Sequence, residues 1–292
     1  MKIALGTVQF GLDYGVSNIY GKTSKHEASQ ILQYAHNSGI EMLDTAMLYG
    51  NSENIISYYS KSNHNWKVVT KTPQFIGNSI NAIHVKQLKK SFEQSLINLN
   101  KNNVYGLLLH SCDDLLKPNG HLLFKEMERL KSIGMVKKIG VSLYSDEQIN
   151  AVINKFNIDL VQLPVNILSQ KLFLDGWLKK LKDSDIEIHA RSVFLQGLLL
   201  MKRSLVPSYF SPIKKKLDKF YRLSKVLGLT QLELSLGFVM NIDEVDKVVV
   251  GANTIGQLQE IIQASQTRLQ LSDYRDISID NNKYTNPSSW KI

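Results

Sequence analysis

Residues 104–142 read VYGLLLHSCDDLLKPNGHLLFKEMERLKSIGMVKKIGVS, and they predict one complete unit of strand, helix and strand. Val104–Leu109 is an apolar run of strand length. Leu122–Ile133 follows with apolar residues at helical spacing, and Lys138–Val141 is a second strand. Two strands that are joined through a helix lie parallel in one sheet, because the crossover returns the chain to the edge where it started. This stretch therefore predicts an α/β protein.

The same alternation continues in both directions along the chain. The other predicted strands are Lys2–Leu5, Glu41–Leu43, Trp66–Thr70, Asp159–Gln162, Glu187–Ala190 and Lys247–Val250. The other predicted helices cover residues 24–37, 53–60, 85–99, 146–156, 172–181, 214–227, 231–241 and 255–265. The first of these helices opens on Ser24-Lys25-His26-Glu27, which has the Ser-x-x-Glu form of a capping box.

Strands that alternate with helices over nearly the whole chain predict a single (β/α)8 TIM barrel. An open doubly wound sheet is the alternative, and it usually carries G-x-G-x-x-G after its first strand. No two glycines in this chain are separated by one residue, so that motif is absent. We expect the barrel to span residues 1–271. A polar tail follows over residues 272–292, either without fixed structure or packed at the barrel mouth through Trp290.

The composition is that of a globular protein, with 43% hydrophobic and 21% charged residues among 292. It excludes a disordered or fibrous chain. No apolar stretch approaches the ~18 residues that cross a bilayer, and the apolar start is too short for a signal peptide. The single cysteine, Cys112, forbids an internal disulfide, and no cluster predicts a metal site. We therefore expect a cytoplasmic protein without a metal.

The formal net charge is +9, but the basic residues are spread along the chain apart from residues 137–138 and 214–216. Such a charge fits a solvated surface or a field that attracts a phosphorylated small molecule. No nucleic-acid recognition motif accompanies it. We expect a small-molecule partner, no nucleic acid and no membrane, with the chain a monomer or a weak homo-oligomer.

Polar residues end most of the predicted strands. In barrels of this kind the chemistry takes place at the carboxyl ends of the strands. Apolar strands gain nothing in packing from ending on a lysine or a histidine, so we expect these side chains to meet at one mouth. They are Asp44, Lys71, His110, Ser142, Gln162 and Arg191.

Tyr49 follows Asp44 by five residues, which lets its loop fold the phenol back over the mouth. A phenol ordinarily has a pKa near ~10. We expect the Lys71 ammonium to lower that pKa and Asp44 to hold Lys71 in place. His110 could orient a carbonyl oxygen by a hydrogen bond. The four residues together suit proton donation to an oxygen while a hydride arrives at carbon.

The chain resembles the aldo-keto reductases, and it is similar to short bacterial members of sugar and polysaccharide metabolism. The resemblance covers residues 1 to about 265 and rests on motifs that come in the family's order. These are Leu5-Gly6-Thr7 with Phe10-Gly11, Leu43-Asp44-Thr45-Ala46 with Tyr49-Gly50, Lys71, Leu108-Leu109-His110, Gly140-Val141-Ser142, Val161-Gln162 with Asn166, and Val250-Gly251-Ala252.

The resemblance implies reduction of an aldehyde or ketone with NADP as the usual cofactor. Tyr49 would be the general acid, supported by Asp44, Lys71 and His110. The residues that it implies at the cofactor are Gly6, Thr7, Ser142, Gln162, Asn166, Arg191, Ser192, Phe194, Gly251, Asn253, Thr254, Gln257 and Glu260.

Three departures from the family pattern bear on the site. Ser142 is followed by Leu143, where many members have an asparagine for the nicotinamide carboxamide. Arg191 stands where many members have an aromatic ring against the nicotinamide. Its guanidinium could stack on that ring, reach an anionic substrate, or turn away to pair with an acid. Residues 251–257 lack the lysine and arginine that many members use on the 2′-phosphate, so NADH is a competitor to NADPH.

Three functions remain open from the sequence. The first is a reductase of a carbonyl compound, with a sugar-derived aldehyde or ketone as the leading substrate class. The second is a redox-sensing regulatory module that binds the cofactor and turns over slowly. The third is a lyase or isomerase on the same barrel, because a fold alone does not fix the chemistry.

Overall fold

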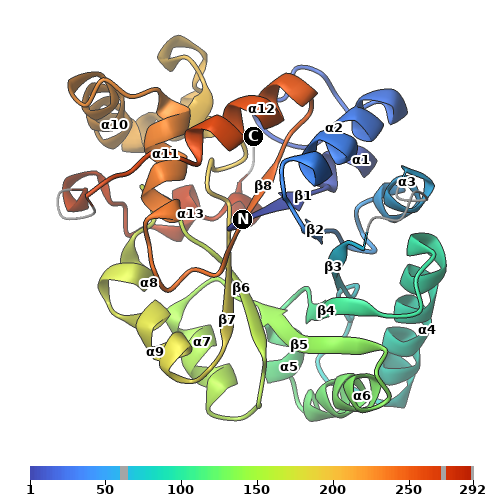
Figure 1. The fold of residues 1–292 in the computed structure, drawn as a ribbon. Helices are drawn as coiled ribbons and strands as arrows, with labels where there is room; N and C mark the ends of the chain where they lie inside the picture. Colours follow the sequence, from blue (N-terminus) through green and yellow to red (C-terminus); the bar gives the residue numbers. More distant parts are fainter. Residues whose placement is uncertain (60–64, 271–273, 291–292) are drawn as a thin grey trace.

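The computed structural model describes residues 1–59, 65–270 and 274–290, and within them eight parallel strands close into a barrel (Figure 1). Each strand pairs with the next, and the last pairs with the first. The strands are β1 Ile3–Gly6, β2 Met42–Asp44, β3 Lys67–Lys71, β4 Val104–Leu109, β5 Val136–Ser142, β6 Leu160–Pro164, β7 Glu187–Arg191 and β8 Lys247–Gly251. The predicted TIM barrel is confirmed.

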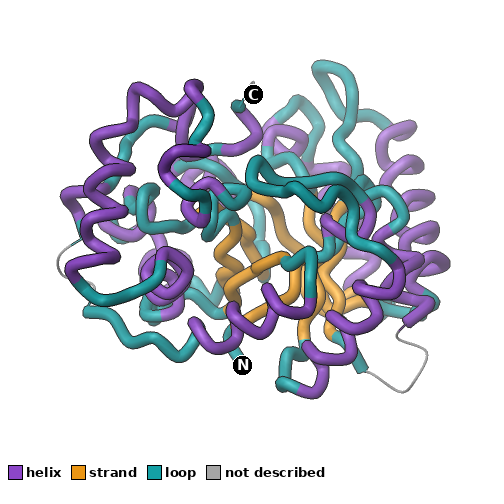
Figure 2. The backbone as a smooth tube through the Cα atoms, turned by 90° about the horizontal axis from the view of Figure 1, so that it is seen from above, coloured by secondary structure: helices purple, strands orange, loops and turns teal. Residues whose placement is uncertain are grey.

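Helices surround the strands, which lie in the middle of the molecule (Figure 2). The α-helices are α1 Val8–Gly11, α2 Lys25–Asn37, α3 Ser52–Tyr59, α4 Ala82–Leu99, α5 Asp113–Leu116, α6 His121–Ser132, α7 Asp146–Ile153, α8 Lys171–Leu174, α9 Trp177–Asp183, α10 Lys214–Val226, α11 Gln231–Met240, α12 Ile255–Ala264 and α13 Asn282–Thr285. Short 3-10 turns are η1 Leu198–Leu200, η2 Arg203–Leu205, η3 Ser208–Ile213, η5 Arg275–Ile277 and η6 Pro287–Ser289. The turns η1 to η3 fill the connection between β7 and α10.

The barrel closes where β1 meets β8 in register, from Ile3 opposite Val248 to Gly6 opposite Gly251. On its other edge Gly6 lies opposite Asp44 of β2. Parallel pairing therefore brings the carboxyl ends of β8, β1 and β2 together. This alignment places residues that are far apart in sequence on one rim.

The helix starts follow the capping chemistry of the sequence. The Ser24 side chain accepts the Glu27 N–H at the start of α2, as expected. The Glu27 carboxylate does not return to α2, however. It accepts the backbone N–H of Ile255 at 2.5 Å, across to the first residue of α12. Of the two hydrogen bonds that a capping box predicts, only the one from Glu27 N–H to the Ser24 side chain forms. The Glu27 carboxylate accepts from the neighbouring helix α12 instead of from the Ser24 N–H.

One predicted helix is divided. The sequence pattern over residues 172–181 predicted a single helix, but the structure has α8 and α9 with Gly176 between them. Gly176 has φ +76°, the left-handed conformation that glycine adopts without steric cost. The apolar spacing survives the break, which is why the pattern did not reveal it.

The barrel interior is filled in layers. One layer consists of apolar side chains, each from a different strand: Ala4, Met42, Val69, Leu108 and Leu160. Toward the amino ends of the strands lies a polar group that we call the amino-end cluster, made of Tyr105, Lys138, Glu187 and His189. His189 is fully buried, and its Nε2 lies 2.7 Å from Glu187 Oε1.

Lys138 Nζ and the Tyr105 hydroxyl complete the amino-end cluster, and they donate to Glu187 Oε2 at 2.5 and 2.6 Å. Burial alone would raise the pKa of Glu187, but these three hydrogen-bond donors outweigh it and lower the pKa well below its usual range. No motif surrounds His189 in the sequence, so this cluster was not predicted.

Beyond the barrel, the Trp290 ring lies edge-on to the ring of Phe210 in η3, with centroids 4.8 Å apart. The expected boundary between residues 271 and 272 lies outside the described residues, as does residue 60, the expected end of a helix. Among the described helices no single one is long and apolar enough to cross a membrane. Residues 208–226 and 231–240 pass that test only as a pair, bent by 93°.

Candidate active site

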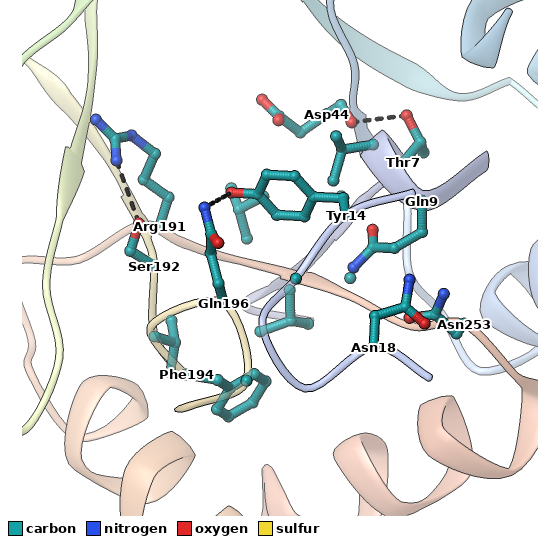
Figure 3. Close-up of a pocket in the computed structure, with 18 of the residues that line it drawn as sticks. Thr7, Gln9, Tyr14, Asn18, Asp44, Arg191, Ser192, Phe194, Gln196 and Asn253 are labelled. Carbon is teal, nitrogen blue, oxygen red and sulfur yellow. Dashed lines mark hydrogen bonds between the residues drawn. The ribbon is translucent and has the colours of Figure 1, made fainter. Parts of the chain in front are cut away.

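A pocket of about 470 Å³ opens at the carboxyl ends of the strands. It runs from Asp44, Tyr49 and His110 past Gly6 and Gly251 to the first two turns of α12. Figure 3 shows lining side chains from the segment after β1, such as Tyr14 and Asn18, opposite those from the end of β7 and its loop, such as Arg191 and Gln196. The position of the pocket is the one at which barrel proteins bind small molecules.

At the base of this pocket Lys71 and Asp44 form an almost fully buried ion pair. Lys71 Nζ donates to both carboxylate oxygens of Asp44, at 2.7 and 2.8 Å, and to the Thr45 carbonyl at 3.0 Å. The Gln162 side-chain amide donates to Asp44 Oδ2 at 2.7 Å. We call Asp44, Lys71 and Gln162 the mouth cluster. Its opposite charges largely cancel, so it presents a dipole rather than a free cation to its neighbours.

Tyr49 stands beside this cluster on a tight turn. The turn packs so closely on α1 that a Cβ at Gly11 would lie 1.7 Å from the Tyr49 carbonyl oxygen. Gly50, at φ +55°, completes the turn. The motif pairs Phe10-Gly11 and Tyr49-Gly50 therefore have one physical cause, because glycine alone permits this approach.

The electrostatics of the phenol differ from the sequence-based expectation. Lys71 Nζ lies 5.2 Å from the centre of the Tyr49 ring, but its three protons are directed at Asp44 and Thr45. Burial is the main reason that the pKa of Tyr49 lies well above its usual value, and the Asp44 charge raises that pKa further. The Arg191 charge opposes both effects. The expected lowering by Lys71 is wrong for this structure, since Asp44 neutralises the ammonium.

His110 faces Tyr49 edge-on, with ring centroids 6.1 Å apart. Burial, and after it the charge of Lys71, lowers the pKa of His110 to about 4. The imidazole is therefore neutral near pH 7 and can serve as a hydrogen-bond donor or acceptor without carrying charge. Its Nδ1 is buried and has no hydrogen-bond partner among the described residues.

Arg191 ends β7 at the rim of the pocket. Its guanidinium carbon lies 4.3 Å from the centre of the Tyr144 ring, and its nitrogens donate to Ser192 Oγ at 3.2 Å and to the Leu143 carbonyl at 3.4 Å (Figure 3 shows the bond to Ser192). Within residues 1–59, 65–270 and 274–290 it forms no ion pair with an acid. Of the three options from the sequence, pairing with an acid is therefore not the one found.

The loop after β7 closes one side of the pocket in a strained conformation. Ser192, Leu195 and Gln196 have φ values of +57°, +48° and +55°. A left-handed conformation costs roughly 1–2 kcal/mol for a residue with a side chain, and such strain clusters at binding sites. The Gln196 side-chain amide donates to the Tyr14 hydroxyl at 3.3 Å, and Tyr14 belongs to the connection between β1 and α2 (Figure 3). The two loops thus meet across the pocket.

At the other end, Gly251 lies against the side chain of Gln9. A Cβ at Gly251 would lie 2.4 Å from the Gln9 side-chain amide. Gln9 Oε1 is buried without a hydrogen-bond partner among the described residues. The pocket therefore holds an unpaired polar atom between the strand ends and α12, which is a feature of a site shaped for a polar ligand.

Most of the residues predicted from the sequence line this single pocket. They are Gly6, Thr7, Asp44, Tyr49, His110, Ser142, Gln162, Arg191, Ser192, Phe194, Gly251, Asn253, Gln257 and Glu260. Lys71 lies behind Asp44. Asn166 and Thr254 do not line the pocket. Asn166 is buried and donates to the Ser192 carbonyl at 3.3 Å, and Thr254 caps α12 by accepting the Gln257 N–H.

The sequence did not indicate several other lining residues, because they sit in loops without periodicity. They are Gln9, Tyr14, Ser17, Asn18, Tyr20, Tyr144 and Gln196. Tyr144 could have been found, since it follows the strand-ending Ser142 by two residues. Cys112 is buried away from this lining, and burial raises the pKa of its thiol to about 12. A search of the described residues gives no group of three or more His, Cys, Asp or Glu that could hold a metal ion.

A closed parallel barrel with a polar pocket at the carboxyl ends of its strands defines the class of barrel enzymes that act on small molecules. The sequence profile described as the Aldo/keto reductase family matches residues 2–280, and the chain belongs to this family. It is an NAD(P)-dependent oxidoreductase that acts on a small-molecule carbonyl compound.

Similar proteins agree with this assignment. An uncharacterized oxidoreductase of Bacillus subtilis, YqkF, is 26% identical over 91% of this chain and 92% of its own length. The aldo-keto reductase YhdN of the same organism is 24% identical over 95% and 88%. Among solved structures, the aldo-keto reductase AKR11C1 of Bacillus halodurans, in its holo form, has a TM-score of 0.73 at 19% identity and covers 99% of this chain and 94% of its own. The glycerol dehydrogenase AKR11B4 of Gluconobacter oxydans has a TM-score of 0.72 at 20% identity, covering 98% and 92%.

Proposed function

We propose that this protein reduces an aldehyde or ketone to an alcohol, with Tyr49 as the proton donor. The observation that supports this most is the meeting of Tyr49, His110 and the mouth cluster at one end of a single elongated pocket. The phenol is protonated throughout the physiological pH range, because its raised pKa keeps the proton on oxygen. The neutral imidazole of His110 offers a hydrogen bond to the substrate oxygen.

The described residues fit a nicotinamide dinucleotide. The unpaired Gln9 Oε1, the contact between Gly251 and Gln9, and the strained loop at Ser192 lie along the pocket between Tyr49 and α12. Ser142 and Gln162 would hold the nicotinamide end, and Asn253, Gln257 and Glu260 the adenosine end. When bound, the cofactor supplies the hydride that reduces the carbonyl carbon.

The protein's own part is to position groups and deliver a proton. Gln162 and Lys71 fix the Asp44 carboxylate by three hydrogen bonds. Arg191 is the cation that lowers the pKa of the phenol against the effect of burial, so it makes the proton easier to transfer. General acid catalysis of this kind contributes about 10²–10⁴-fold to a rate.

Arg191 also bears on the substrate. Its guanidinium has no acidic partner in the described part of the chain, while Tyr144 holds it flat at the rim. A free cation at that place favours a carbonyl compound with an anionic group, such as an acidic sugar derivative. Stacking of Arg191 on the nicotinamide is the competing role, and the two are separated by experiment below.

Tyr49→Phe tests the proposal. The variant should bind NADH or NADPH as the wild type does, while kcat on a panel of aldehydes and ketones should fall about 10²–10⁴-fold. Tyr58→Phe on the exposed side of α3 is the matched control and should leave kcat unchanged. Near-normal turnover of Tyr49→Phe would remove this residue from the role. Tight nucleotide binding by the wild type without turnover on any carbonyl would favour the redox-sensing module instead.

A further inference from the structure

The donors at the amino end of α12 are largely used within the protein. Ile255 N–H donates to Glu27 Oε1 at 2.5 Å, and Gln257 N–H donates to Thr254 Oγ1 at 3.2 Å. Asn253 N–H donates to the Gln257 side chain at 2.8 Å. A helix start is otherwise a ready site for phosphate, because free N–H groups and the helix dipole favour an anion. Here a carboxylate already takes that position.

Glu27 reaches this place because the barrel closes there. It lies in the first turn of α2, which packs beside α12 since β1 and β8 are neighbours. Its carboxylate is partly buried between the two helices. The bond therefore joins residues that are 228 positions apart, and it is fixed by the fold rather than by a local turn.

Positive charge is also missing from this end of the pocket. Arg191, at the end of β7, is the one lysine or arginine among the described lining residues, whereas Glu260 on α12 adds an acid. Lys22 lies five residues before Glu27 in the sequence, but it does not line the pocket. Its Nζ donates to Asn51 Oδ1 at 2.6 Å. A phosphate at this end would meet the Glu260 carboxylate in the lining and few free donors. The Glu27 carboxylate lies behind the lining, on the Ile255 N–H, and adds a second negative charge.

We propose that Glu27 makes the pocket select NADH over NADPH. This inference rests on the proposed function, which places the adenosine half of the cofactor beside Asn253, Gln257 and Glu260. The 2′-phosphate of NADPH carries about two negative charges, and the Glu27 carboxylate repels it at the site that would otherwise attract it. The ribose 2′-hydroxyl of NADH is neutral and can donate a hydrogen bond to a carboxylate, as in other NAD sites.

Fluorescence titration of the substrate-free protein with each nucleotide tests the proposal without reference to turnover. The Kd for NADH should be at least about tenfold lower than the Kd for NADPH at low salt. This ratio should shrink at high ionic strength, because salt screens the repulsion. Equal affinities, or tighter binding of NADPH, would overturn the selectivity and leave the proposed reduction intact. Binding of neither nucleotide would overturn both.

Glu27→Gln isolates the charge, because the amide oxygen can still accept the Ile255 N–H. Its Kd for NADPH should fall about tenfold, while its Kd for NADH should change less than about twofold. Glu128→Gln, an exposed change on α6, is the control and should alter neither value. Glu260→Gln shows which acid acts: a change in the ratio with Glu260→Gln but not with Glu27→Gln would contradict the assignment to Glu27.

Discussion

The barrel interior contains two clusters of buried charge, and they differ in what surrounds them. In the mouth cluster the Asp44 carboxylate accepts from Lys71 and Gln162 and borders the open pocket with Tyr49. In the amino-end cluster the Glu187 carboxylate accepts from His189, Lys138 and Tyr105 and is closed off from that pocket. We propose that the same chemistry serves reactivity at the pocket end and stability at the other.

The difference lies in the neighbours of each carboxylate. Beside the mouth cluster stand the Tyr49 phenol, whose pKa burial and Asp44 raise, and the His110 ring, whose Nδ1 has no hydrogen-bond partner among the described residues. Both carboxylates have a donor on each oxygen, and His189 Nδ1 in the amino-end cluster also lacks a partner among the described residues. The difference is that Asp44 lines the open pocket and Glu187 does not. Both carboxylates raise the pKa of a neighbouring phenol, but only Asp44 and Tyr49 do so at the pocket, where a ligand can reach them. This contrast predicts separable effects of mutation.

Lys71→Met should have the largest effect, on activity. It leaves the Asp44 carboxylate without its cation beside Tyr49, which raises the pKa of the phenol further and slows proton donation about 10²–10³-fold. The alkaline limb of the pH profile for reduction should move upward. The double variant Asp44→Asn/Lys71→Met restores neutrality and should recover part of the rate. If single and double variants are equally slow at matched thermal stability, Lys71 acts other than by balancing Asp44.

Glu187→Gln should affect stability instead. Three donors lose their charged acceptor, and the free energy of unfolding should fall by about 3 kcal/mol, with kcat per folded molecule within about twofold of wild type. Because the pKa of Glu187 is lowered in the folded state, its stabilisation is present above about pH 4.3 and is lost as the pH falls. Urea unfolding at several pH values measures both. Glu128→Gln, the exposed control, should change stability by less than about 0.5 kcal/mol. A large loss of kcat in Glu187→Gln would break the contrast between the clusters.

His110 should make the protein sensitive to mild acid. Its pKa is lowered to about 4 in the folded protein, so only the unfolded chain takes up a proton between about pH 6.5 and pH 4.5. The free energy of unfolding therefore decreases as the pH is lowered through this window. The decrease should be about 2 kcal/mol larger in wild type than in His110→Gln. Chemical unfolding of both proteins across the window gives the difference. Parallel pH curves for the two would show that His110 titrates normally.

Arg191→Gln should have the smallest effect, and a selective one. If the guanidinium binds an anionic substrate group, KM should rise about tenfold, or ~1.4 kcal/mol, for 4-carboxybenzaldehyde and stay constant for 4-carbamoylbenzaldehyde. If it stacks on the nicotinamide, the nucleotide Kd should change instead. Arg222→Gln on α10 is the matched control for loss of one charge. Should kcat, KM and Kd all stay unchanged, Arg191 is structural and does not tune the phenol.

The sequence pattern predicted the strands and the polar residues at their carboxyl ends for a simple reason, while the other predicted lining residues came from the family resemblance. An apolar run indicates a buried strand, and a polar residue at its end indicates where the strand reaches the rim of the barrel. Both features can be read from a few consecutive residues. Asp44, His110 and Gln162 were found in this way. Asn166 was implied only by the family resemblance, and its side chain donates to the Ser192 carbonyl rather than lining the pocket.

What escaped the sequence depends on contacts between distant segments. Glu27 satisfied a local capping pattern, yet its carboxylate bonds to Ile255. His189 and Tyr105 belong to different strands, and only barrel closure brings both to Glu187. The predicted pKa of Tyr49 was wrong because Lys71 directs its hydrogen bonds at Asp44 and Thr45. The sequence alone does not show this geometry.

The pairing of β1 with β8 also bears on how the chain is made. Ile3 pairs with Val248, which is synthesised much later. Lys2 Nζ likewise donates to the carbonyls of Met240 and Ile242. At about 5–20 residues per second, synthesis leaves the first strand without its last partner for roughly 12–50 seconds. Until then β1 has an open edge, and non-local pairing of this kind folds slowly. The nascent chain therefore acquires the pocket only after β8 has been synthesised, since Gly6 and Gly251 come together in the same step.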